Sequence, residues 1–186
     1  MRWESLFDDL AGQLAAESAA DFEAEVQELA RMEAAAISVM DRFRASTGRT
    51  VVLGLAGGAR LAGELLRCGD DWLLLRDGPR SVLVPLTAIL WTSGAAPTAV
   101  PLRGGAPFPL TSALRGLARD RAAVLVSTRE SGAAGLAGVI DAVGRDYLQL
   151  ALVPAGEPRR TSAVQESRLL PLAALASVSS VLPESG

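Results

Sequence analysis

Few side chains in this chain could carry out chemistry, and their types exclude several reaction classes. The 186 residues include one cysteine, Cys68, and neither histidine nor lysine. A cysteine–histidine nucleophile pair, a Schiff-base lysine and the phosphate-binding lysine of a P-loop are therefore excluded. We expect Cys68 to be structural rather than reactive, because Arg67 is the only adjacent residue that would lower the pKa of its thiol.

The acidic residues do not suit metal binding or acid–base catalysis. Asp70 and Asp71 are adjacent in a predicted strand turn, without a third carboxylate at the spacing that calcium requires. The glycines of GLAGGARLAG, residues 54 to 63, indicate a hairpin turn rather than a phosphate cradle. The sequence thus predicts a protein that is not an enzyme, with no catalytic residue, no metal site, no cofactor and no small-molecule substrate.

Charge divides the chain into an acidic start and a mildly basic remainder. Residues 1–41 hold ten acids and two arginines, a net charge of −8, whereas residues 42–186 have a net charge of +5. The basic side chains near the predicted third and fourth strands are candidates for nucleic-acid binding: Arg76, Arg80, Arg145, Arg159, Arg160 and Arg168. The alternative is ordinary solvated loop charge.

A repeat organises these side chains. LAGELLRCGDDWLLL, residues 61–75, returns as LAGVIDAVGRDYLQL at residues 136–150, with seven of fifteen positions identical. Further on, LVPLTAI matches LLPLAAL at a larger offset, so the second copy carries an insertion within residues 151–168. The shared residues are turn glycines and core leucines, which predicts two copies of one structural unit.

Each copy reads as a run of short strands. TVVLGL, ARLAGELLR, DWLLLR and SVLVPL are separated by turn-forming residues, and AILWTS gives a fifth strand. Gly63 falls where a strongly bent strand needs no side chain. We expect an α+β, mainly β fold: an N-terminal helical segment followed by two tandem five-stranded small β-barrels.

The LVPL motif before the last strand resembles the connection found in SH3-like and Sm-like barrels, including the Hfq type, and also resembles PRC-type barrels. The Sm-like resemblance covers residues 37–93 and 111–181 and implies an RNA-associated fold. The asparagine that contacts the base in that family is replaced here by Leu73 and Leu148, and its arginine–glycine pair is replaced by Pro-Leu. The resemblance therefore implies the fold without the uridine pocket.

Apolar stripes mark the N-terminal segment as helical. The first stripe includes Trp3, Leu6 and Leu10 at helical spacing, and a second runs from Phe22 to Phe43. Such stripes need a partner: the two helices pack together as a hairpin, the second helix lies along a barrel, or the stripes assemble with a second molecule.

Two matched aromatic residues provide a second candidate surface. Trp72 and Tyr147 occupy equivalent positions, out of phase with the core leucines, and Leu74 on the same face becomes Gln149. These residues either seal each barrel against its own helix or form a docking platform. The candidates for protein interaction are accordingly Trp3, Leu6, Leu10, Trp72, Leu74 and Tyr147.

We expect four regions: an acidic helical segment at 1–46, a first barrel at 47–93, a Pro/Gly linker at 94–110, and a short helix with a second barrel at 111–182. The sequence predicts a cytoplasmic interaction or scaffold protein that binds itself, as a homo-oligomer, or another protein, and no membrane. The alternative is an Sm-like regulator that binds RNA or DNA.

Overall fold

The computed structural model describes residues 22–29, 31–32, 34–102, 104, 106–130, 132, 134–153 and 166–181. The chain forms two compact units, Met1–Ser38 and Val39–Gly186. In the first unit, residues 22–29, 31–32 and 34–36 are helical. Within the described ranges, no helix combines the length and hydrophobicity that a bilayer crossing demands.

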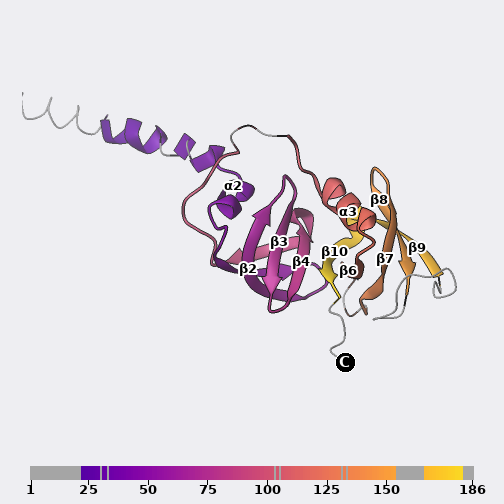
Figure 1. Ribbon diagram of the computed structural model, residues 1–186. Coiled ribbons are helices and arrows are strands. Elements are labelled where there is room, and N and C mark those ends of the chain that lie inside the picture. Colours follow the sequence, from indigo (N-terminus) through magenta and orange to yellow (C-terminus); the bar gives the residue numbers. More distant parts are fainter. Residues whose placement is uncertain are drawn as a thin grey trace, which may run out of the picture. The chain divides into compact units, whose positions relative to one another are not determined.

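The second unit is built on one antiparallel sheet of ten strands (Figure 1). Its first half contains the short helix α2 (Val39–Arg44) and five strands: β1 (Thr50–Leu55), β2 (Arg60–Cys68), β3 (Trp72–Asp77), β4 (Arg80–Pro85) and β5 (Ile89–Ser93). Its second half contains α3 (Leu110–Arg119) and five strands: β6 (Ala123–Thr128), β7 (Leu136–Val143), β8 (Tyr147–Leu152), β9 (Glu166–Pro171) and β10 (Leu175–Ser180).

The strand order is β5-β1-β2-β3-β4-β10-β6-β7-β8-β9. The expected mainly β architecture behind an N-terminal helix is therefore confirmed, but the two separate closed barrels are not what forms. In each half the last strand returns to the first, and β4 then pairs with β10 of the other half. Because that pairing takes up the open edge of β4, the two halves share one continuous sheet.

The repeated glycines of the second strand are explained by a close backbone approach. A Cβ atom at Gly63 would collide with the carbonyl oxygen of Arg76, and one at Gly138 would collide with that of Ala151. Only glycine fits where the backbone of the neighbouring strand comes this close.

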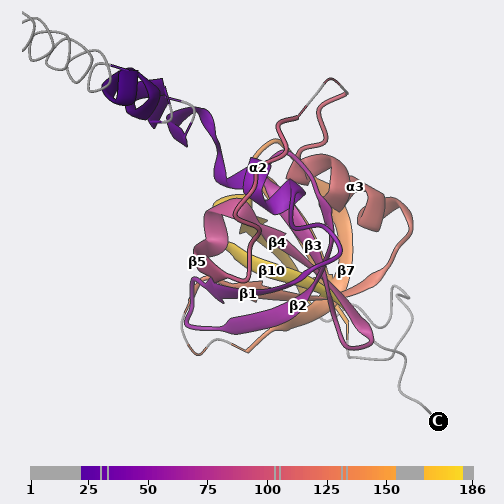
Figure 2. The same cartoon turned by 90° about the vertical axis from the view of Figure 1, so that its left-hand side faces the viewer.

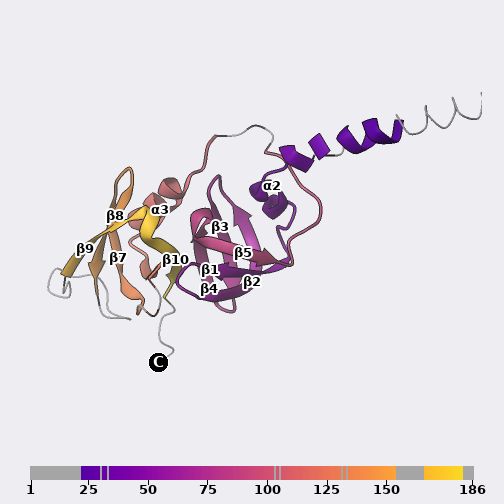
Figure 3. The same cartoon turned by 180° about the vertical axis from the view of Figure 1, so that it is seen from behind.

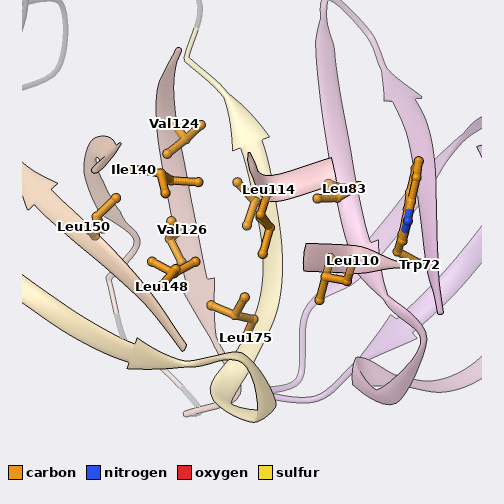
Figure 4. Packing of buried hydrophobic residues seen from close by; sticks show 11 residues of the cluster. Trp72, Leu83, Leu110, Leu114, Val124, Val126, Ile140, Leu148, Leu150 and Leu175 are labelled. Atoms are coloured by element: carbon orange, nitrogen blue, oxygen red, sulfur yellow. The ribbon is translucent and has the colours of Figure 1, made fainter. Parts of the chain in front are cut away.

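Two hydrophobic clusters fill the second unit. The first packs Met40 and Phe43 of α2 against leucines and valines of β1 to β4. The second lies around α3, whose Leu110 and Leu114 are in one cluster with Trp72 and Leu83 of the first half and with core residues of the second half (Figure 4). Figure 2 shows α2 and α3 as separate helices, each belonging to one half. Helix α3 therefore fills the space between the halves.

Candidate interaction surfaces

The chain itself occupies the Trp72 face. Leu73 and Leu75 point into the first cluster, whereas Trp72 and Leu74 on the opposite face of β3 pack with α3. The Trp72 side chain is 2% exposed. Its indole N–H donates to the Phe108 carbonyl oxygen at 2.9 Å, and the two rings meet edge to face at 5.2 Å. Trp72 thus binds the segment that leads into α3.

The adjacent acids hold the same segment. The Asp70 carboxylate accepts a hydrogen bond from the Phe108 backbone N–H at 2.7 Å, and the Asp71 carboxylate accepts one from the Leu110 N–H at 2.7 Å. The Arg67 guanidinium lies 5.4 Å from the centre of the Phe108 ring. This pair of carboxylates therefore satisfies backbone donors at the start of α3, which Pro109 precedes without a side-chain cap.

Tyr147 is the counterpart of Trp72 in the second half, and its surroundings differ. Both rings cover the turn glycine before them, since a Cβ at Gly69 or Gly144 would collide with Trp72 or Tyr147 respectively. Tyr147 is 36% exposed. On the same face, Gln149 donates to the Ser167 hydroxyl at 2.9 Å. The same backbone site is thus covered in one half and open to solvent in the other.

The outer strands of the sheet carry further exposed apolar side chains. Strand β5 exposes Leu90 and Trp91, and β9 exposes Leu169. Trp91 lies over Gly54 of β1, where a Cβ would collide with its indole ring. Figure 3 shows β5 across the first half and β9 at the far end of the second half. Large apolar side chains on edge strands are a common template for pairing with another chain.

The predicted N-terminal surface is only partly described. Trp3, Leu6 and Leu10 lie outside the described residues. In the described helix, Phe22, Val26 and Leu29 follow one another at intervals of four and three residues and are 47% to 67% exposed. This spacing places them on one face.

The candidate nucleic-acid arginines are scattered, and several are paired with acids. Arg76 lies 3.8 Å from Glu64, and Arg80 lies 3.0 Å from Asp77. Arg168 is 3.0 Å from Glu166, which lowers the pKa of that exposed carboxyl through the hydrogen bond. Arg159 and Arg160 lie outside the described residues.

Arg145, another of the described candidates, lines a hollow. This hollow, about 350 Å³, lies where the halves meet and includes Asp71, Thr111, Arg129 and Leu172. Arg129 donates to the carbonyl oxygens of Thr87 at 2.7 Å and Ala173 at 3.2 Å, so its guanidinium links the halves. Among the described residues, no group of three or more histidine, cysteine or acidic side chains is placed to hold a metal ion.

Cys68 is half-buried, and burial is the main cause that raises the pKa of its thiol, opposed by a hydrogen bond with Thr47 and by the charge of Arg44. The thiol is therefore held in its protonated, less nucleophilic form at neutral pH.

Sequence reasoning missed three parts of these surfaces: Phe108, the hydrogen bonds of Asp70 and Asp71, and the edge residues of β5 and β9. A signal for Phe108 was available, since it is the one aromatic residue in the Pro/Gly stretch between the repeats.

In comparisons with known proteins, no family model, curated protein or solved structure matches the chain.

Proposed function

We propose that this chain is a non-catalytic interaction protein that associates with further copies of itself. The observation that carries the proposal is that the two repeated halves join edge to edge within one chain, through β4 and β10. Each half therefore already pairs, edge to edge, with a second copy of the same structural unit. The outer strands at the two ends of the sheet carry large exposed apolar side chains that such an association would cover.

We infer further that each half is an open form of the SH3-like or Sm-like unit. The same strand order in both halves supports this assignment, as does the 3₁₀ turn before each last strand, at Leu86–Ala88 and Leu172–Ala174. Leu73 and Leu148, at the positions where the Sm-like family has its base-contacting asparagine, are fully buried. Their burial favours a binding role for the unit that does not use a uridine pocket.

Three of the described candidate arginines weigh against the alternative role in RNA or DNA binding. Arg76, Arg80 and Arg168 each have an acidic neighbour within 4 Å, and their pairs neutralise charge that a phosphate would need. A filter-binding assay with pooled RNA at low salt tests this alternative directly. If the amount of RNA retained with the protein falls as the salt concentration rises, the result would favour a role in RNA binding.

The proposed function predicts a mass in solution above that of one chain. Light scattering of the full chain should give more than 19.3 kDa, with an average mass that rises with protein concentration. A constant value of 19.3 kDa over the whole concentration range would overturn the proposal.

The described helix offers a second surface for the same partner. The four- and three-residue spacing of Phe22, Val26 and Leu29 is the spacing at which two helices pack together. The double variant Val26→Asp, Leu29→Asp should therefore lower the average mass. Glu23→Gln, an exposed position outside the stripe, is the matched control and should leave the mass unchanged.

A further inference from the structure

The junction between the halves provides a template for contact between molecules. At this junction β4 and β10 run antiparallel, with Val178 opposite Leu83 and Ser179 opposite Val82. The Ser81 N–H also donates to the Ser180 hydroxyl at 3.1 Å. Leu83, which is 5% exposed, is covered by this pairing and by α3.

The two halves are equivalent residue by residue around this junction. Thr92 of β5 lies opposite Leu53 of β1, as Val178 of β10 lies opposite Val126 of β6. A register shift occurs at the same place in both pairs, between Gly54 and Leu55 and between Leu175 and Ser177. Strand β5 is therefore the counterpart of β10.

The same equivalence holds for the other side of the junction. Leu83 of β4 lies opposite Leu74, as Leu169 of β9 lies opposite Gln149. Pro85 lies opposite Trp72, as Pro171 lies opposite Tyr147. Strand β9 is therefore the counterpart of β4, and the outer edges β5 and β9 are the two complementary sides of a junction like the internal one.

The exposed fractions of Leu169 and Leu83 show which side chain a junction at β9 would cover. Leu169 is 63% exposed, whereas its counterpart Leu83 is 5% exposed. An isolated edge strand that presents a large apolar residue is a liability, because it pairs readily with another strand. Among the described residues, no strand pairs with β9 at Leu169 as β10 pairs with β4 at Leu83.

From this equivalence, which rests on the proposed self-association, we infer that β9 of one molecule pairs antiparallel with β5 of a second copy. The register is that of the internal junction, with Leu169 opposite Thr92 and Arg168 opposite Ser93. No charged residue occurs in β5, so Arg168 faces the neutral Ser93 across the pair. The pairing continues the sheet from one chain into the next.

The surface beside β5 has room for the incoming side chain. A hollow of about 270 Å³ is lined by Val39, Arg42 and Phe43 of α2 and by residues 92–95. At the internal junction, the counterparts Val178 and Ser179 line a smaller hollow of about 80 Å³, together with Leu83. Leu83 helps to fill the internal space, and Leu169 of a second copy would enter the space beside Thr92.

The geometry makes the contact head to tail. Strands β5 and β9 are at opposite ends of the strand order, so each pairing leaves one outer strand free on each molecule. Such a contact is heterologous, and it either closes into a ring or continues as a filament.

Disulfide pairs test the register. All variants carry Cys68→Ser to remove the native thiol. The edge pair Ser93→Cys, Arg168→Cys should form disulfides between chains, because opposed residues of an antiparallel pair have Cβ atoms about 4.5–5.5 Å apart. The internal pair Val82→Cys, Ser179→Cys is the matched calibration, since it occupies the counterpart positions and should close within one chain. Leu90→Cys, Arg168→Cys is the out-of-register control.

The expected result is a shift of the edge pair from the monomer band to a ladder on a non-reducing gel. The internal pair should shift only in mobility, and the out-of-register control should stay monomeric. In addition, Ser93→Cys and Arg168→Cys as single variants should crosslink when mixed and not when either is alone, because the contact is head to tail.

The outcomes separate this inference from the proposed function. If the mass in solution is multimeric and the internal pair crosslinks, but the edge pair does not, the β5–β9 contact is wrong and self-association stands. Crosslinking of either single variant alone would likewise overturn the head-to-tail contact. A monomeric mass together with an uncrosslinked edge pair would overturn both.

Discussion

The two halves of the sheet show what happens to one structural unit when a neighbour is present and when it is not. In the first half, the face formed by Trp72, Leu74 and Leu83 is covered by Phe108 and α3. In the second half, the same positions hold Tyr147, Gln149 and Leu169, and no described segment covers them in this way. Compared with the first half, Tyr147 is more amphipathic than Trp72 and Gln149 is polar where Leu74 is apolar, as suits a face open to solvent. Leu169, like Leu83, is apolar. Leu169 shares its apolar character with Leu83, and its exposure supports the proposed contact with a second copy.

The largest difference between the halves is expected for the two aromatic residues. Trp72→Ala removes a buried indole and its hydrogen bond to Phe108, so it should lower the free energy of unfolding by about 3–5 kcal/mol. Tyr147→Ala removes a partly exposed ring and should lower it by less than about 1 kcal/mol. Urea denaturation of both variants at a protein concentration where the chain is monomeric measures the comparison. Equal losses would mean that the Trp72 contact is no stronger than a surface contact.

The leucine pair gives a somewhat smaller contrast. Leu83→Ala should cost about 2–4 kcal/mol of folding stability, because the side chain is buried between β4, β10 and α3. Leu169→Ala should change the stability of the monomer by about 0.5 kcal/mol or less, but should lower the average mass in solution. Denaturation and light scattering on the same samples separate the two effects. A Leu169→Ala protein with an unchanged mass would remove the distinction between a covered and an uncovered junction residue.

Asp71 and its counterpart Asp146 extend the comparison to the turn before each aromatic residue. Asp71→Ala leaves the Leu110 N–H without its carboxylate acceptor, which should cost about 1–2 kcal/mol. Asp146→Ala, the counterpart in the second half, should cost about 0.5 kcal/mol or less, since the described structure records no hydrogen bond to its side chain. Asp71→Asn is the control, because its amide oxygen can still accept the N–H and should retain part of the stability. If Asp146→Ala were as destabilising as Asp71→Ala, the carboxylate would matter for the turn itself rather than for α3.

Much of each half could be predicted from the sequence, because the alternation of apolar residues and the turn glycines act locally. The repeat of residues 61–75 at 136–150 correctly indicated two strands joined by a tight turn in each half. The joining of the halves could not be predicted in the same way. Alternation determines which face of a strand is buried, but every edge strand offers the same N–H and C=O groups, so the pattern does not say which strand lies beside β4.

The contacts of Trp72 show a similar limit. Its position out of phase with Leu73 and Leu75 indicated the face, but not what covers that face. The partner, Phe108, lies in a stretch whose prolines and glycines have no period, and Asp70 and Asp71 hold it through backbone donors that any residue would supply. Sequence patterns do not encode such contacts, since only the side-chain half of each hydrogen bond is visible in the sequence.

The smallest expected effect concerns Cys68, whose counterpart in the second half is Val143. Because both positions are partly buried among apolar residues, Cys68→Val should change the free energy of unfolding by less than about 1 kcal/mol. Burial raises the pKa of the Cys68 thiol above its ordinary value of 9.0, so the folded protein should react with iodoacetamide at pH 8 more slowly than the same protein in urea.

The same pKa shift makes the stability depend on pH. The thiol loses its proton at a higher pH in the folded state than in the unfolded state. Its contribution to the free energy of unfolding is therefore complete below pH 9.0 and is lost as the pH rises through the higher pKa of the folded state. Cys68→Val should remove that part of the loss of stability at alkaline pH. Equal alkylation rates in the folded and unfolded protein would show that the thiol is not shielded, and that this position in the first half differs from Val143 in its burial as well as in its chemistry.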